Sequence, residues 1–150
     1  MMDKKLVILG AGQSGVGAAI LGKKMGYEVL VSDQNNINTE LQALLEKEGI
    51  RWEAGQHTLE SMQEAHLVIK SPGIPSDVPL IKTLKAQGKT ICSEIEFAAQ
   101  HTSATLIGIT GTNGKTTTTL LTYQILKEAG LHVGMAGNIG TSFALQVAQT

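Results

Sequence analysis

The segment from residue 105 to residue 129 constrains the fold of this 150-residue chain more than any other segment. An apolar, strand-like run at 105–109 leads into Gly111-Thr112-Asn113-Gly114-Lys115-Thr116-Thr117, and a helix-like run at 118–129 follows. Glycines in such a turn let backbone N–H groups face an anion, and the start of the helix adds partial positive charge. The segment therefore predicts the phosphate-binding strand, loop and helix of an α/β protein.

This loop is shorter than the common G-x-x-x-x-G-K-[ST] pattern, because Ile109 stands where that pattern has its first glycine. In the pattern the lysine reaches the terminal phosphates and the following hydroxyl ligates Mg²⁺, which gives these roles to Lys115 and Thr116. The alternative is a glycine-containing turn that carries a surface lysine. We favour a nucleotide site at residues Gly111 to Thr117.

Composition narrows the classes of protein that the chain can belong to. Hydrophobic residues make up 42% of the chain, there are 17 glycines, and the net charge is -1. A core and many tight turns are therefore expected, whereas a basic face for nucleic acid is not. No apolar run approaches the ~20 residues of a membrane span. Cys92 is the single cysteine, which favours a reducing cytoplasm and a small buried residue over a reactive thiol.

Strand-like and helix-like runs alternate along the chain, which predicts a mainly parallel sheet with right-handed crossovers. Strands are expected at 5–9, 28–32, 51–53, 67–70, 90–92, 105–109 and 131–135. Helices are expected at 15–25, 38–48, 77–86, 94–100 and 118–129, with a last one from residue 142. The predicted class is α/β, with a Rossmann-like parallel-sheet domain at 1–102 and the start of a P-loop α/β domain at 103–150.

A second glycine loop, Gly10-Ala11-Gly12-Gln13-Ser14-Gly15, follows the first expected strand and opens a helix. Asp33 stands about 20 residues further on, at the end of the next strand, where an acid can meet a ribose hydroxyl. The alternative is a glycine-rich turn that serves only helix-strand packing. Two nucleotide-type loops in one short chain favour either a hydride-transfer domain joined to an ATPase, or a ligase or kinase that holds a nucleotide-linked substrate beside ATP.

Four motifs together resemble the Mur ligases of peptidoglycan synthesis, and most of all the D-glutamate-adding members. They are the loop at 10–15, Ser71-Pro72-Gly73-Ile74-Pro75, Ser93-Glu94-Ile95-Glu96-Phe97, and the loop at 108–117 with the later Gly137-Asn138-Ile139-Gly140. Their order and spacing span essentially the whole chain. The short G-T-N-G-K-T loop is the usual form in this family. A tripeptide-forming member of the family is the nearest alternative.

The resemblance implies which residues bind which ligand. UDP-N-acetylmuramoyl-L-alanine would meet Gly12, Gln13 and Ser14 through its pyrophosphate, Asp33, Gln34 and Asn35 at uracil and ribose, Ser71, Pro72 and Gly73 beside the uridine, and Asn138 at a phosphate. Gly111 to Thr117 would hold the ATP phosphates, with Lys115 and Mg²⁺ on Thr116 neutralising charge during phosphoryl transfer. The implied reaction activates the substrate carboxylate as an acyl phosphate, which the amine of D-glutamate then attacks.

The sequence also predicts that this chain alone is inactive. After Lys115 the only carboxylate side chain is Glu128, late in the expected helix, so the acid that usually helps a P-loop to hold Mg²⁺ is missing. We expect an N-terminal piece of a longer ligase, whose second half associates with another copy or packs unusually on the first domain. A nicotinamide-binding module and a nucleotide-sensing domain remain as rival interpretations.

Overall fold

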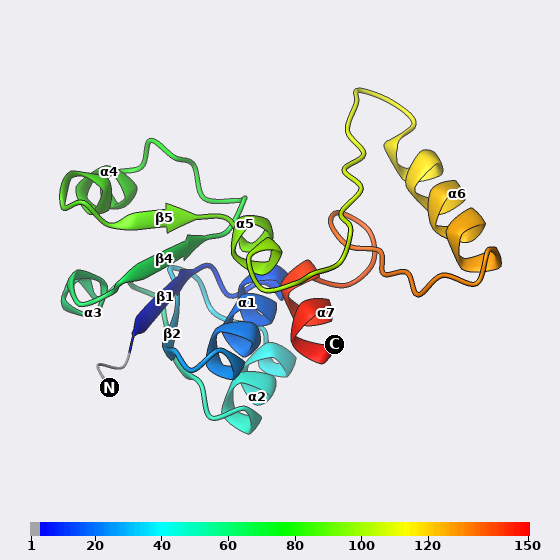
Figure 1. The fold of residues 1–150 in the computed structure, drawn as a ribbon. Coiled ribbons are helices and arrows are strands. Elements are labelled where there is room, and N and C mark those ends of the chain that lie inside the picture. The colour runs from blue at the N-terminus through cyan, green and yellow to red at the C-terminus, as the bar shows by residue number, and fades with distance from the viewer. Residues whose placement is uncertain (1–3) are drawn as a thin grey trace.

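The computed structural model describes residues 4–150, and these residues contain one five-stranded parallel sheet (Figure 1). The order across the sheet is β3-β2-β1-β4-β5. The strands are β1 (Lys5–Leu9), β2 (Glu28–Asp33), β3 (Arg51–Ala54), β4 (Leu67–Lys70) and β5 (Thr90–Cys92). All five strands agree with the expected positions to within one residue at their ends, and the expected parallel arrangement is confirmed.

Helices cover both faces of the sheet, as expected when each parallel strand is followed by a crossover. They are α1 (Gln13–Lys24), α2 (Thr39–Lys47), α3 (Leu59–Gln63), α4 (Pro79–Ala86), α5 (Glu94–Ala99), α6 (Lys115–Glu128) and α7 (Phe143–Gln149). The short helix α3 was not expected from the sequence. Its five residues are too few to show a helical period.

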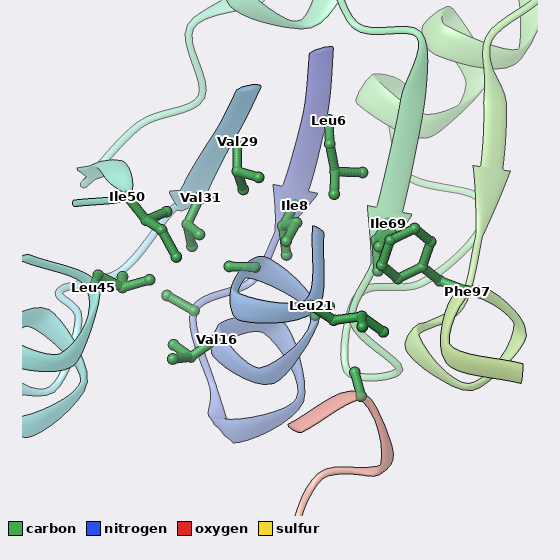
Figure 2. Close-up of a cluster of buried hydrophobic side chains, with 14 of the residues drawn as sticks. Leu6, Ile8, Val16, Leu21, Val29, Val31, Leu45, Ile50, Ile69 and Phe97 are labelled. Atoms are coloured by element: carbon green, nitrogen blue, oxygen red, sulfur yellow. The ribbon is translucent and has the colours of Figure 1, made fainter. Parts of the chain in front are cut away.

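Alternate residues of β1 point into two separate hydrophobic clusters. Leu6 and Ile8 face the larger cluster, which also contains side chains of α1, α2, α5 and α7 (Figure 2). Val7 and Leu9 face the smaller cluster, which also contains Met62 of α3 and Ile81 of α4. Because β1 is buried on both faces, it forms the centre of the sheet, and the loop that follows it starts from a fixed point.

The second half of the chain differs from the sequence-based expectation. Neither 105–109 nor 131–135 is a strand among the described residues, so the two strands expected there are wrong. A strand needs a neighbour to pair with, and beyond the five-stranded sheet residues 4–150 show only an isolated bridge between Ala136 and Thr141. The expected helices are present, but α6 buries no residue and stands away from the sheet in Figure 1.

α7 behaves differently from α6, because it packs on the first half of the chain. Ala144 is fully buried, Ala148 is nearly so, and both belong to the larger cluster. Figure 1 shows α7 beside α1, close to α5. The alternative expectation, that the second half packs against the first domain, is therefore met by α7. Within residues 4–150, no helix has the length and apolar character needed to cross a membrane.

Candidate functional site

The candidate site lies where the parallel strands end at their carboxyl edge. β1 lies between β2 and β4. The chain first crosses through α1 to β2 on one side of β1, and later places β4 on the other side, so the strand order reverses at β1. In open α/β sheets such a reversal of strand order leaves a crevice outside the strand ends, where ligands bind. The first glycine loop, Ser71 and Ser93 follow strands at this edge, and Asp33 is the last residue of β2.

Two glycines of the first loop are explained by close packing within the protein. Gly10 has φ +98°, and a Cβ there would lie 2.5 Å from the Ser71 hydroxyl oxygen. A Cβ on Gly15 would lie 1.9 Å from the carbonyl oxygen of Gly10. The loop therefore turns tightly at Gly10 and brings the first turn of α1 against the end of β1.

Gly12 has no such explanation within the protein. Its φ of -75° suits any residue, it is exposed, and a Cβ there would meet no atom within 4 Å. Gly12 is also the N-cap of α1, and no side chain caps this end of the helix. The N–H groups of the first turn, at Gln13 and Ser14, thus have no side-chain cap, and an uncapped helix start of this kind suits an anion.

Asp33 ties two loops together through its carboxylate. Oδ2 accepts a hydrogen bond of 2.7 Å from the Ala11 amide, and Oδ1 accepts one of 2.8 Å from the Asn35 amide. Gln34 and Asn35 are exposed beside it. Each carboxylate oxygen keeps a further lone pair, so Asp33 can fix the loop shape and still accept a hydroxyl of a ligand.

A polar network behind Asp33 was missed by the sequence analysis. The buried Ser32 hydroxyl lies 2.6 Å from Oε1 of Glu53 and 2.7 Å from Nδ1 of His57. Thr58 donates to Glu53 from its amide at 2.9 Å and from its hydroxyl at 2.6 Å. Ser32 and Glu53 meet because they are paired across β2 and β3, and no pattern in a single sequence reveals this pairing.

The Ser32 hydroxyl also fixes the tautomer of His57. Burial would raise the pKa of Glu53, but hydrogen bonds from Ser32 and Thr58 outweigh burial and hold this pKa below its ordinary value. Glu53 is therefore a carboxylate at neutral pH and must accept the single proton of the Ser32 hydroxyl. The second neighbour of that hydroxyl, Nδ1 of His57, must then carry a proton and donate it to the Ser32 oxygen.

The turn after β4 forms the other side of the crevice. The Ser71 amide donates to the Leu9 carbonyl at 2.9 Å, which joins this turn to the end of β1. Pro72 and Gly73 are exposed, and Pro72 lines a cavity of about 200 Å³ together with Cys92 and Ser93. Burial, and secondarily the nearby Glu96, raises the pKa of Cys92 to about 11. Cys92 is thus a half-buried thiol of low reactivity, as expected.

The loop at 137–140 approaches the first glycine loop from the other half of the chain. Gln13 and Gly140 line the same cavity of about 330 Å³, with Ser142 and apolar residues of α2 and α7 around it. Asn138 is exposed in this loop. The structure therefore brings the 137–140 loop together with the first glycine loop at this cavity.

The second glycine loop, at 111–117, is separate from this edge in Figure 1. Gly114 caps α6 with φ +76°, and no side chain caps this 14-residue helix. The Lys115 ammonium donates to the carbonyls of Gly111 and Thr112, so it folds back over its own loop. An uncapped helix start with a lysine at its mouth suits a phosphate group. Among residues 4–150, no group of three His, Cys, Asp or Glu side chains could hold a metal ion, and Thr116 is an exposed hydroxyl.

Comparison with known proteins gives two family matches that follow one another along the chain. Residues 4–93 match the Mur ligase MurD-like N-terminal domain, and residues 109–150 match the Mur ligase middle domain. The chain is 57% identical over 146 residues to the UDP-N-acetylmuramoylalanine--D-glutamate ligase of Bacteroides fragilis. It is 58% identical over 146 residues to the protein of the same name from Bacteroides thetaiotaomicron.

Each of these alignments covers 97% of this chain but 33% of the relative, so the chain spans about a third of the length of the curated relatives that it matches. Among solved structures, a pseudomurein peptide ligase type C from Methanothermus fervidus is similar with a TM-score of 0.62 and 31% identity. That similarity covers 97% of this chain and 31% of the other. The expected Rossmann-like fold of the first half is confirmed. With a family match over residues 4–93, the chain belongs to the Mur ligases, with an N-terminal domain of the MurD-like type.

Proposed function

We propose that the chain is the N-terminal part of an ATP-dependent ligase of the cytoplasm. This ligase adds D-glutamate to UDP-N-acetylmuramoyl-L-alanine in peptidoglycan synthesis. The observation that carries the proposal is the open, uncapped start of α1 at Gly12, at the switch point of the sheet. Relatives that are 57% and 58% identical and bear the name of this ligase support the choice of substrate.

The proposed organisation has two parts. Residues 1–102 would bind the UDP-linked substrate, and residues 103–150 would begin the ATP-binding central domain. The two family matches, at 4–93 and 109–150, support a boundary between them. α7 packs on α1 across this proposed boundary, so the two parts would share a surface next to the substrate.

In the proposed substrate site, the amides at Gly12, Gln13 and Ser14 bind the pyrophosphate of UDP-N-acetylmuramoyl-L-alanine. Asp33, Gln34 and Asn35 lie at the uracil and ribose, with Ser71, Pro72 and Gly73 on the opposite side. Asn138 reaches a substrate phosphate from the 137–140 loop. The open space beside Gly12 supports this arrangement, because a Cβ there would meet no protein atom within 4 Å, which leaves room for a pyrophosphate close to the backbone.

In the proposed ATP site, Gly111, Thr112, Asn113, Gly114, Lys115, Thr116 and Thr117 surround the phosphates. Lys115 would leave the carbonyls that it now contacts and stabilise negative charge on the transferring phosphoryl group. ATP would arrive with Mg²⁺, for which Thr116 offers a hydroxyl ligand. The substrate carboxylate takes the γ-phosphoryl group and releases ADP, and the D-glutamate amine then displaces phosphate to form the amide.

For the 150-residue chain itself we expect binding of the UDP-substrate without turnover. Titration with UDP-N-acetylmuramoyl-L-alanine should give saturable heat, and NADH should give none. NADH binding alone would favour a nicotinamide module, and ATP binding alone would favour a nucleotide sensor. With ATP, Mg²⁺ and both substrates present, robust release of phosphate would overturn the expected inactivity.

Gly12→Leu tests the proposed pyrophosphate contact. A Cβ at residue 12 would meet no protein atom within 4 Å, so the fold should be kept while affinity for the UDP-substrate falls at least about tenfold, through loss of hydrogen bonds to a charged group. Ala86→Leu adds a similar side chain at the exposed end of α4 and serves as the control. Unchanged affinity in the Gly12→Leu variant would remove the pyrophosphate from this loop.

A further inference from the structure

The carboxyl group of Glu94 is buried and contacts a segment far away in sequence. Glu94 is 5% exposed, and its Oε1 accepts hydrogen bonds from the Ser142 hydroxyl at 2.9 Å and from the Ala144 amide at 2.6 Å. No ion pair involves Glu94 in the part of the chain that the structure describes. A buried carboxyl group needs such donors, so the position of Glu94 depends on α7 and the position of α7 depends on Glu94.

These contacts complete the cap at the start of α7. Ser142 is the N-cap, and its hydroxyl oxygen accepts from the Leu145 amide at 3.2 Å while its proton goes to Glu94. The Ala144 amide is one of the N–H groups that has no partner within the helix, and Glu94 accepts from it. Ser142 and Glu94, which lies about 50 residues earlier in the sequence, therefore cap α7 together.

Two further contacts hold α7 along its length. A Cβ on Gly17 would lie 2.1 Å from the Ser142 hydroxyl oxygen, so this glycine lets α1 approach the start of α7. At the other end, the Lys24 ammonium donates to the Ala148 carbonyl. Glu94 and Gly17 therefore both act on the end of α7 next to the 137–140 loop, and of the two Glu94 is the one that accepts its hydrogen bonds.

The 137–140 loop depends directly on the position of α7. The Gln146 side chain, on α7, donates to the carbonyls of Met135 and Thr141, on either side of the loop. The bridge between Ala136 and Thr141 closes the base of the loop. Gly140 then lines the cavity that it shares with Gln13 of the first glycine loop.

We propose that Glu94 is a positioning residue for the substrate site: by capping α7 it holds the 137–140 loop beside the first glycine loop. A UDP-linked substrate then meets both loops in one fixed arrangement. This inference rests on the proposed function for the identity of the ligand, but not for the contact itself. Glu96, two residues later, is exposed and caps its own helix through Ser93, so this role belongs to Glu94 alone of the two acids.

The test compares Glu94→Ala with Glu94→Gln in the 150-residue chain, with exposed Glu46→Ala as the control. Amide hydrogen exchange of residues 136–149 is measured without ligand, and the Kd for UDP-N-acetylmuramoyl-L-alanine is measured by calorimetry. Glu94→Ala should raise exchange at the Ala144 and Leu145 amides and raise Kd, each about tenfold. Glu94→Gln keeps an oxygen that accepts both hydrogen bonds, so it should restore both values to near those of the unmodified chain.

Ser142→Ala provides a second route to the same answer, because it removes one donor without emptying the buried site at Glu94. If Glu94 acts through Ser142, adding Ser142→Ala to Glu94→Ala should change exchange and Kd little further. Three outcomes would overturn the inference. The first is unchanged amide exchange in Glu94→Ala, and the second is equal changes in exchange and Kd in Glu94→Gln and Glu94→Ala. The third is that the effects of Ser142→Ala and Glu94→Ala on exchange and Kd add fully in the double variant. Absence of binding by the unmodified chain would contradict the proposed function, while the exchange data would still decide the role of Glu94.

Discussion

At the scale of residues, the network of Ser32, Glu53 and His57 supports the nucleotide edge from behind. Ser32 accepts a hydrogen bond from the Gly10 amide through its carbonyl, at 2.8 Å, while its hydroxyl binds Glu53 and His57. Gly10 begins the first glycine loop, and Asp33, next to Ser32, holds Ala11 of that loop. A change in this buried network should therefore alter the loop without any direct contact to a ligand.

Glu53 should make the stability of the chain depend on pH in the acid range. Its pKa is held below its ordinary value in the folded state, so the stabilisation that it gives is present above the unfolded pKa and is lost as pH falls through the folded pKa. Urea unfolding from about pH 7 to about pH 3 should show this loss, and Glu53→Gln should reduce it. Exposed Glu60→Gln is the control. An equal acid loss in the unmodified chain and in Glu53→Gln would show that Glu53 does not contribute.

At the scale of elements, the contact between α1 and α7 depends on a missing side chain. Alanine normally stabilises a helix interior by about 1 kcal/mol relative to glycine, so Gly17→Ala should favour α1 by itself. Its Cβ, however, would lie 2.1 Å from the Ser142 hydroxyl oxygen and 3.1 Å from the Leu145 amide nitrogen. Such overpacking costs about 1–3 kcal/mol, so we expect a net loss of stability.

Hydrogen exchange separates the two effects of Gly17→Ala. The amides of α7 should exchange faster, whereas those of β1 should change only with global stability. Gly22→Ala is a matched control, because its Cβ would meet Leu6 of the sheet, 2.4 Å away, and not α7. A Gly17→Ala variant with greater stability and unchanged exchange in α7 would mean that α7 is not tightly docked on α1.

The elements also show where sequence reasoning succeeds. β1 and α1 are predictable because a buried apolar run, a glycine turn and a helical run follow one another locally. The runs at 105–109 and 131–135 have the same local pattern, but a parallel strand also needs a neighbouring strand, which local pattern does not supply. The β-propensity of these residues favours strands, but no strand forms there because no pairing partner is present among the described residues.

The candidate site follows the same division. The glycine loop and Asp33 were found because their spacing is local and fixed by the turn, although their ligand contacts stay predictions. The contacts of Glu94 and of Ser32 were not found, because their partners lie far away in the sequence. Ser142 is 48 residues from Glu94, and Glu53 is 21 residues from Ser32 and is brought to it by strand pairing. Contacts of this kind become visible only when the topology is known.

At the scale of the whole molecule, the two halves differ in how much apolar surface they bury. The first half has a two-sided core, whereas Leu121 and Ile125 on α6 are 60% and 56% exposed, and Ile107 before the loop is 61% exposed. Exposed apolar groups of this size on one helix favour association in water. The chain also spans about a third of the length of its curated relatives.

We therefore keep the prediction that this chain associates with a second copy, and the exposed apolar side chains now place the contact on α6 as a further prediction. Light scattering after size exclusion should give a mass that rises with concentration towards that of a dimer or larger species. Leu121→Lys combined with Ile125→Lys places charges on the exposed apolar face of α6 without touching the core, so the variant should remain a monomer. Leu59→Lys combined with Ile95→Lys, at exposed apolar positions on α3 and α5, is the control, because it makes the same change in net charge and apolar surface elsewhere. A monomer at every concentration, with the same hydrogen exchange in α6 as in the double variant, would show that this face has no partner in solution.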